Sequence, residues 1–205
     1  WTTAEPLYLV MELVVGTTLR ARITPEGMPL PEVRAWLGGV VSALSHAHSQ
    51  GVVHCDLKPD NVMITTDGRV RVMDFGIASC RRLPRMTLTT DVLGTPGYLA
   101  PEQLDGVRND PRTDQYALGV MVFHCLTGLP PFFEADLRRM LVRQLMEEAP
   151  LLHTLRADVP EDFSQAVARM LAKTPEERFD SMDAAWAVLA ESQEEAGPTR
   201  FMEWQ

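Results

Sequence analysis

Residues 54–61 spell HCDLKPDN, and two short motifs follow this stretch in order, DFG at residues 74–76 and APE at residues 100–102. All three place charged, amide or turn-forming side chains between apolar runs. Any one motif alone is typical of a turn, because Asp, Asn, Gly and Pro are the usual turn formers. Their order and spacing together predict a single catalytic site built from several loops.

The composition is typical of a soluble globular protein. The chain has 205 residues, of which 45% are hydrophobic and 23% charged, enough to bury a core in one domain or two. Its net charge of -9 argues against a nucleic-acid partner, because phosphate backbones are bound chiefly by clustered Lys and Arg. The longest strongly apolar stretch, residues 117–126, is shorter than the ~20 residues that cross a bilayer, so we expect no membrane span.

Cysteine usage indicates the compartment. Cys55, Cys80 and Cys125 are odd in number and lack both a CxxC pair and zinc-ligand spacing with histidine. Such thiols are typical of reduced intracellular proteins, so the sequence predicts a cytoplasmic location.

One small β-hairpin is predicted next to the first motif. Residues 62–64 and 70–72 are short β-like runs, and Thr66-Asp67-Gly68 between them is a hairpin turn signal. An apolar segment over residues 7–11 has strand character as well. We expect the charged motif residues in the loops around the hairpin.

The rest of the sequence is predicted to be mainly helical. Apolar residues recur at helical spacing from Leu30 until Gly51 stops the pattern, which indicates an amphipathic helix on the core. Residues 116–126 are apolar nearly all round, as in a helix buried on every side. Further helices are predicted over residues 133–146, 161–171 and 181–191, with Ser181 and Asp183 as candidate N-terminal caps of the last.

The motif residues fit phosphoryl transfer, a reaction that depends on positioning and charge neutralisation more than on covalent help. Asp56 would accept the proton of a substrate hydroxyl, and Lys58 in the same loop could reach the transferring phosphate. Asn61 and Asp74 offer hard oxygen ligands, which suit Mg2+ held by few protein groups together with nucleotide phosphates.

The run DLKPDN at residues 56–61 and the run GTPGYLAPE at residues 94–102 resemble those of protein kinases of the serine/threonine type, with bacterial eukaryotic-like kinases nearest in pattern. The resemblance covers residues 7–191 and concerns the C-terminal lobe. It implies an α+β protein-kinase-like fold, with a mainly helical C-lobe, a small β-hairpin and an N-lobe that is mostly absent. Residues 1–16 would be the last N-lobe strand and the hinge, residues 17–192 the C-lobe, and residues 193–205 the start of a C-terminal linker.

The resemblance also implies ATP and Mg2+ as cofactors and a protein as substrate. By that match, Thr95 packs its hydroxyl against the catalytic Asp56 and Lys58, while Asn61 and Asp74 hold the metal. The matched nucleotide positions are Met11 as gatekeeper, Glu12 and Val14 in the adenine-binding hinge, and Met63 beneath the purine.

Further matched positions are expected to be structural. Asp114 corresponds to the aspartate that braces the catalytic loop, although Thr113-Asp114 before an apolar helix can also be interpreted as a plain N-terminal cap. Arg178 corresponds to the arginine that pairs with Glu102. We expect His54 to be a core histidine rather than a base.

Cys55 occupies a position where the family has arginine. In kinases with that arginine, a phosphate on the activation loop pairs with the guanidinium and orders the loop. We therefore expect phosphorylation of Thr87, Thr89 or Thr90 to be weakly coupled to activity. Cys55 itself is expected to be a neutral buried thiol.

The sequence does not contain the family's glycine-rich loop, the lysine that holds the α- and β-phosphates, or the glutamate that positions this lysine. We therefore expect the chain to be a fragment of a longer kinase, whose missing N-lobe is required for activity. The isolated fragment should be inactive and poorly soluble, since Met63 and Phe75 would face water.

Three functional classes remain open. The chain could belong to an active serine/threonine kinase, to a pseudokinase that serves as a scaffold or allosteric interaction module, or to a phosphotransferase of small molecules. Retention of both Asp56 and Asp74 favours the first class over the second. Residues 94–102, the peptide-docking segment of the family, argue against the third.

Overall fold

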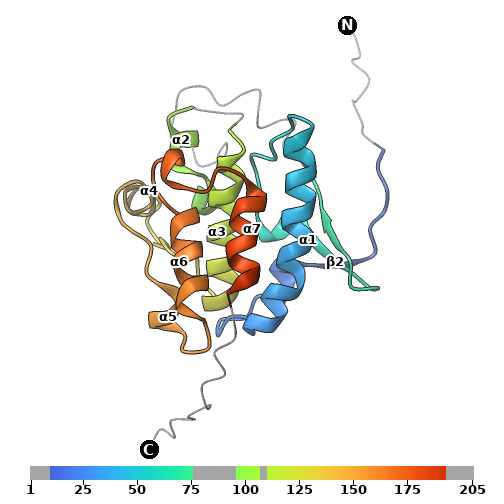
Figure 1. The fold of residues 1–205 in the computed structure, drawn as a ribbon, viewed down its shortest axis with the longest axis horizontal. Helices are drawn as coiled ribbons and strands as arrows, with labels where there is room; N and C mark the ends of the chain where they lie inside the picture. The colour runs from blue at the N-terminus through green and yellow to red at the C-terminus, as the bar shows by residue number, and fades with distance from the viewer. Residues whose placement is uncertain (1–9, 76–95, 107–109, 193–205) are drawn as a thin grey trace, which may run out of the picture.

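The computed structural model describes residues 10–75, 96–106 and 110–192 (Figure 1). Most of these residues belong to helices packed around one buried helix, and a small sheet lies at the side of the molecule. The α+β class and the mainly helical character predicted from the sequence are confirmed.

The described residues form a sheet of three antiparallel strands, β1 (Gly16–Thr18), β2 (Val62–Thr65) and β3 (Val70–Val72). β2 and β3 make the predicted hairpin, in which Val62 lies opposite Val72 and Ile64 opposite Val70. Gly68 stands in the turn with a φ of 81°, a left-handed conformation that glycine adopts without steric penalty. The hairpin connects the motif at residues 54–61 to the motif that begins at Asp74, and its strand β3 packs against α1.

β1 is a strand that the sequence pattern did not indicate, because three residues are too few to show an apolar alternation. It pairs with β2 so closely that a Cβ atom on Gly16 would lie 2.4 Å from the Ile64 carbonyl oxygen. The strand predicted over residues 7–11 is wrong for Val10 and Met11, which precede β1 outside any strand, and residues 7–9 lie outside the described residues. An apolar run forms a strand only where it meets a hydrogen-bonding partner.

The first long helix, α1 (Leu30–Ser49), has the bounds that its periodicity predicts. Its apolar face is buried against α3, α7 and β3. Gly51 follows the helix with a φ of 72°, the left-handed conformation that commonly ends helices. A Cβ atom on Gly39 would lie 2.7 Å from the Val70 side chain, so the helix and hairpin approach more closely than alanine would allow.

The central helix is α3 (Arg112–Thr127), which is buried from Thr113 to Leu126. Figure 1 shows it in the middle of the molecule, with α6 (Glu161–Met170) and α7 (Met182–Glu191) packed against it. The helix ends at Gly128, whose φ is 79°. The prediction of a helix apolar nearly all round and buried on every side is therefore confirmed.

Shorter elements connect these helices. They are η1 (Leu19–Arg22), η2 (Pro59–Asn61), η3 (Pro96–Tyr98), α2 (Pro101–Leu104), α4 (Leu137–Met146), α5 (Leu152–Leu155) and η4 (Pro175–Glu177). The helix predicted from Phe133 begins only at Leu137, because the Asp136 carboxylate caps it by accepting from the Arg139 amide at 2.9 Å.

The caps of α7 were predicted in part. The Ser181 hydroxyl accepts from the Ala184 amide at 3.0 Å, as an N-cap does. Asp183, the second candidate, lies inside the helix and accepts from the Ser45 hydroxyl of α1 at 2.6 Å. It therefore joins two helices instead of capping one. Within the described ranges, the structure contains no helix of the length and hydropathy that a membrane span requires.

Candidate active site

The loop between α1 and β2 brings together three of the predicted catalytic residues. The Lys58 ammonium donates to Oδ2 of Asp56 at 2.9 Å, and the Asn61 amide nitrogen approaches the same oxygen at 3.4 Å. Asn61 also donates to the Asp56 main-chain carbonyl at 2.8 Å. Leu57 is 1% exposed and fixes the loop to the core between the polar side chains. The loop therefore presents a carboxylate, an ammonium and an amide from one compact turn.

Asp114 holds the start of this loop from the buried helix α3. Its carboxylate accepts from the amides of His54 at 2.8 Å and Cys55 at 2.9 Å, and from His48 Nε2 at 2.8 Å. The match to a bracing aspartate is confirmed, and the alternative of a plain N-cap is wrong because α3 begins earlier, at Arg112. No sequence spacing indicated His48 as a partner.

Cys55 is buried and adopts a φ of 63°. A left-handed conformation at a residue other than glycine costs about 1 to 3 kcal/mol and persists only where neighbouring groups impose it. The amide of Cys55 is fixed by Asp114, which supplies part of that constraint. The predicted burial of the Cys55 thiol is confirmed.

His54 connects the catalytic loop to the segment that follows β3. The Asp56 amide donates to its Nδ1 at 3.3 Å, while Nε2 lies 3.0 Å from the Met73 carbonyl. An amide can only donate and a carbonyl can only accept, so this arrangement requires the tautomer with its proton on Nε2. Because His54 is also fully buried, the prediction of a core histidine is confirmed.

Asp74 follows Met73 in the sequence, and its side chain is exposed. Its φ of 53° is left-handed, and the preceding amide of Met73 donates to the Asn61 carbonyl at 2.8 Å. The next residue, Phe75, packs against His54 with tilted rings whose centroids are 4.7 Å apart. Phe75 and Met63 are each half-buried, so the expectation that both face water is wrong.

The predicted metal ligands can be tested against these contacts. Because the Asn61 amide nitrogen donates to Asp56, its amide oxygen points the other way and keeps its acceptor capacity. The exposed Asp74 adds a carboxylate, which gives the hard oxygen donors that Mg2+ prefers. The two residues therefore fit a Mg2+ ion that takes its remaining ligands from phosphate and water.

The predicted nucleotide residues lie on the segment that enters β1. Met11 and Glu12 are exposed, and Val14 is half-buried. Val15 continues the sheet, since its carbonyl accepts from the Thr66 amide at 3.4 Å. The segment continues into β1, which pairs with β2, so that Thr18 of β1 lies opposite Met63 of β2. Thr95, the remaining predicted catalytic residue, lies outside the described residues, as do Thr87, Thr89 and Thr90.

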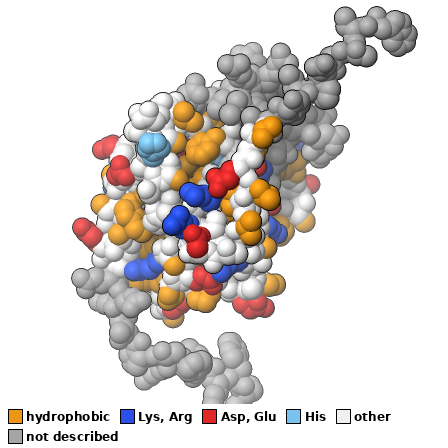
Figure 2. Space-filling model, turned by 90° about the vertical axis from the view of Figure 1, so that its right-hand side faces the viewer, with side chains coloured by type: hydrophobic (Ala, Val, Ile, Leu, Met, Phe, Trp, Pro, Cys, Tyr) orange, Lys and Arg blue, Asp and Glu red, His pale blue; other side chains and the backbone are white. Residues whose placement is uncertain are grey.

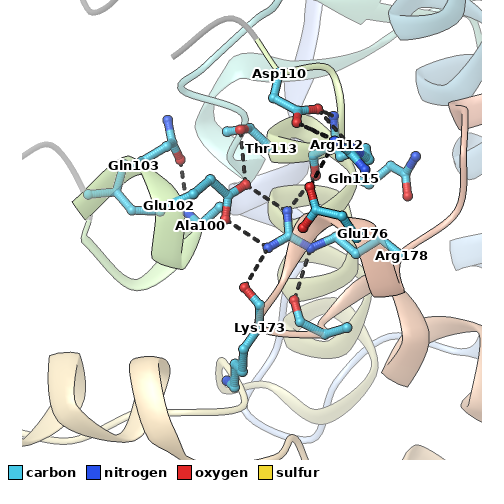
Figure 3. A network of polar contacts seen from close by, with 12 residues as sticks. Ala100, Glu102, Gln103, Asp110, Arg112, Thr113, Gln115, Lys173, Glu176 and Arg178 are labelled. Carbon is cyan, nitrogen blue, oxygen red and sulfur yellow. Dashed lines mark hydrogen bonds and ion pairs between the residues drawn. The ribbon is translucent and has the colours of Figure 1, made fainter. Parts of the chain in front are cut away.

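A buried ion pair anchors the short helix α2 to the core (Figure 3). Arg178 donates to both carboxylate oxygens of Glu102, at 2.7 and 2.8 Å, and also to the carbonyls of Ala172 and Arg112, each at 2.9 Å. The Thr113 hydroxyl donates to Glu102 at 3.1 Å. The predicted pairing is confirmed. A further bond to the Lys173 carbonyl, at 3.4 Å, gives each of the five N–H groups of the guanidinium an acceptor.

Lys173 lies beside this ion pair and carries a perturbed charge. Burial, together with the nearby charge of Arg178, lowers its pKa to about 8. Its ammonium lies 3.9 Å from the centroid of the Phe132 ring and donates to the Gln144 carbonyl at 2.8 Å. Gln144 in turn donates to the Leu99 carbonyl, which connects α4 to the segment before α2.

A second chain of contacts fixes the same segment, and no sequence pattern indicates it. His124 of α3 bonds to the Tyr98 hydroxyl through Nδ1 and to Arg20 of η1 through Nε2, the latter at 3.2 Å. Burial, with a contribution from Arg20, lowers the pKa of His124 to about 4. Because arginine can only donate, Nε2 is the acceptor and the ring proton lies on Nδ1, toward Tyr98.

Comparisons with known proteins are consistent with this geometry. The family model described as "Protein kinase domain" matches residues 1–187. The chain is 37% identical over 195 residues to Serine/threonine-protein kinase PknL of Mycobacterium tuberculosis, a match that covers 95% of this chain and 49% of that protein. It is 38% identical over 177 residues to Serine/threonine-protein kinase PknD of the same species, covering 85% of this chain and 26% of PknD.

A third relative comes from another bacterium. Serine/threonine-protein kinase PrkC of Bacillus subtilis is 36% identical over 177 residues, covering 86% of this chain and 27% of PrkC. The chain thus spans about half the length of PknL and about a quarter of PknD and PrkC.

Proposed function

This chain belongs to the protein kinase family, and from that membership we propose that it is part of a serine/threonine kinase that transfers the γ-phosphate of ATP to hydroxyl groups of protein substrates. The observation that carries the proposal is the convergence of Asp56, Lys58 and Asn61 in one loop. A loop that served only as a turn would not need an ammonium, a carboxylate and an amide within hydrogen-bonding distance of one another.

Asp56 is proposed to orient the substrate hydroxyl and accept its proton. Lys58 and Asn61 both approach Oδ2 of its carboxylate, which leaves Oδ1 as the oxygen for the substrate. The side chain is about a third exposed, so a peptide can reach it while the carboxylate is held in place. Lys58 supplies a positive charge beside the position where negative charge is redistributed during transfer.

Asn61 and Asp74 are proposed to hold Mg2+, which supplies charge neutralisation to the nucleotide phosphates when bound. Glu12 and Val14 would bind adenine through their main chain, with Met11 beside the base and Met63 beneath it. Support comes from the sheet, which connects the segment carrying Glu12 and Val14 to the strand carrying Met63. Thr95 is proposed to add its hydroxyl to the pair formed by Asp56 and Lys58.

We also propose that residues 17–192 act as a C-lobe, with residues 1–16 as the last N-lobe strand and hinge and residues 193–205 as a linker. Apolar side chains before β1 support this division, because Val10, Leu13 and Val15 are 83%, 86% and 64% exposed. Figure 2 shows hydrophobic side chains on the surface of this side of the molecule. An N-lobe packed here would cover them, and without it the chain should be inactive and poorly soluble.

The test is phosphate transfer by the complete protein that contains this chain. Mg2+-dependent transfer of radiolabelled γ-phosphate to a basic protein is measured for the wild type and for Asp56→Asn. We expect Asp56→Asn to reduce transfer by ~10²- to 10⁴-fold, the usual contribution of a positioned acid or base. Asp60→Asn, an exposed carboxylate of the same loop, is the matched control and should retain activity.

The alternative is a pseudokinase that serves as a scaffold or allosteric interaction module. The substitution at Cys55 is the feature of the chain that favours it. Nucleotide binding without transfer by the wild type would contradict the proposed kinase activity and support this alternative. Phosphate on serine and threonine of the acceptor, identified after hydrolysis, separates a protein kinase from a phosphotransferase of small molecules.

A further inference from the structure

Gln103 joins the catalytic loop to the segment that precedes α2. Its amide nitrogen donates to the Cys55 carbonyl at 2.9 Å, and its amide oxygen accepts from the Ala100 amide at 2.9 Å. Figure 3 shows the side chain turned toward Ala100. Both ends of one neutral side chain are thus bonded to main-chain groups, those of Cys55 and Ala100, that lie 45 positions apart in the sequence.

The Cys55 carbonyl is the group that precedes the catalytic carboxylate. The φ of 63° at Cys55 turns the chain sharply before Asp56, and such a conformation needs external support. Asp114 fixes the amide side of Cys55, and Gln103 fixes the carbonyl side. The peptide groups on both sides of Cys55 are therefore held by different helices, α3 and α2.

The helix that carries Gln103 is itself anchored. Glu102, the neighbouring residue of α2, forms the buried ion pair with Arg178 and accepts from Thr113. Two adjacent side chains of one helical turn therefore have different partners, one in the buried ion pair and the other in the catalytic loop. A displacement of α2 would be transmitted to the peptide group that enters Asp56.

We propose that Gln103 is a positioning residue, which holds the Cys55 peptide group so that the Asp56 carboxylate stays in its reactive orientation. The role rests on the proposed kinase function, because Asp56 must be the group that receives the substrate hydroxyl. Gln103 acts through the main chain of the catalytic loop and has no contact with the reacting groups in its assigned role.

Two substitutions separate the two hydrogen bonds of Gln103. Gln103→Met keeps the length of the side chain and removes both bonds. Gln103→Glu keeps an oxygen for the Ala100 amide but, as a carboxylate, has no hydrogen to donate to the Cys55 carbonyl. Gln165→Met, at an exposed glutamine of α6 that bonds to Glu161, is the matched control.

The first readout is steady-state kinetics of the complete protein. We expect kcat to fall between ~10- and ~100-fold in both Gln103 variants, because a small misplacement of a catalytic group has effects of that size. The KM for ATP should be unchanged, because the proposed nucleotide residues do not touch Gln103. A purely structural role would lower the melting temperature and leave the kcat of the folded variants unchanged, and that result would overturn the proposal.

The second readout is amide hydrogen exchange, which does not require activity. In Gln103→Glu, residues 55–58 should exchange roughly five- to tenfold faster, as expected for the loss of one hydrogen bond, while the Ala100 amide stays protected. In Gln103→Met both regions should exchange faster. Unchanged protection of residues 55–58 in both variants would overturn the inference about Gln103, whether or not the wild type transfers phosphate. Absence of phosphate transfer by the wild type would by itself reject only the proposed function.

Discussion

Two ion pairs in this protein each join a basic side chain to a carboxylate, but they differ in how deeply they are buried. The side chains of Arg178 and Glu102 are 0% and 8% exposed, and their closest nitrogen and oxygen atoms are 2.7 Å apart. The side chains of Lys58 and Asp56 are 18% and 31% exposed, with 2.9 Å between the charged atoms. The first pair anchors α2 to the core, and the second lies in the candidate site. Their difference separates the charges that maintain the fold from those that perform the proposed chemistry.

The buried pair is fully committed to protein partners. Arg178 is bonded to both oxygens of Glu102 and to main-chain carbonyls, so the cost of removing its charge from water is offset by several acceptors. The partly exposed pair of Lys58 and Asp56 has one direct contact between its charges and keeps access to water. In the proposed function, a substrate would therefore replace water at Asp56 without rearrangement of the core.

Breaking the buried pair should have the largest effect on stability. We expect Arg178→Met to lower the free energy of unfolding by ~3 to 5 kcal/mol, because Glu102 would remain as a buried charge without its counterion. Thermal unfolding followed by circular dichroism should show a melting temperature lower by roughly 6 to 20 °C. The double variant Glu102→Leu/Arg178→Met should recover part of this loss. A single variant as stable as the wild type would contradict the structural role.

A substitution at Asp114 tests the group that connects the core to the catalytic loop. Asp114→Asn replaces one acceptor oxygen by a donor, which leaves at least one of the donors from His48, His54 and Cys55 without an acceptor. We expect a loss of ~2 to 3 kcal/mol, the penalty for a buried unsatisfied donor near a charge, together with lower kcat. Chemical denaturation measures the first effect. Asp183→Asn, at the exposed contact with Ser45, is the control and should change stability little.

Breaking the pair of Lys58 and Asp56 in the catalytic loop should affect activity strongly and stability little. Lys58→Met should change the free energy of unfolding by less than ~1 kcal/mol, because partly exposed ion pairs contribute little to stability. Activity should fall by ~10²- to 10³-fold, the range seen when one group that stabilises developing charge is removed. Parallel measurements of denaturation and phosphate transfer make the comparison direct. A strongly destabilised but active variant would show that Lys58 is structural.

The smallest predicted effect concerns Lys173 and depends on pH. Its pKa is lowered from 10.5 to about 8 in the folded protein, so between these values the unfolded chain binds more protons. Stability contributed by this group therefore rises with pH from about 8 toward 10.5 and is absent below about 8. Between pH 8 and 10.5, the free energy of unfolding of the wild type should rise by roughly 1 kcal/mol relative to that of Lys173→Met, after allowance for the partial exposure of Lys173.

Comparison of the wild type with Lys173→Met separates the effect of Lys173 from that of other groups that titrate at high pH. Burial raises the pKa values of Tyr98, Tyr116 and Cys125, and these groups are shared by the wild type and Lys173→Met. Denaturant unfolding at several values between pH 7 and 10.5 gives the difference. A difference independent of pH would contradict the lowered pKa of Lys173.

Much of the local structure could be predicted because its signals are local. Apolar spacing predicts α1, α3 and α6, a turn signal predicts the hairpin, and the position of Ser181 before an apolar helix predicts its cap. Errors arose where a distant partner decides the outcome. Asp183 bonds to Ser45 across a helix interface, and residues 10 and 11 lack the strand neighbours that their apolar character suggested. Apolar spacing predicts too early a start for α4, because it does not reveal the capping role of Asp136.

The sequence by itself determined the family resemblance, the proposed catalytic residues and most helix positions, since these depend on residue type and spacing over short distances. Only the tertiary structure decided how the site is supported. Asp114 reaches the amide of His54 across 60 positions, and Gln103 reaches the Cys55 carbonyl across 48. Such bonds carry no periodic signal, because they form only after packing of α2 and α3 brings distant main-chain groups within hydrogen-bonding distance.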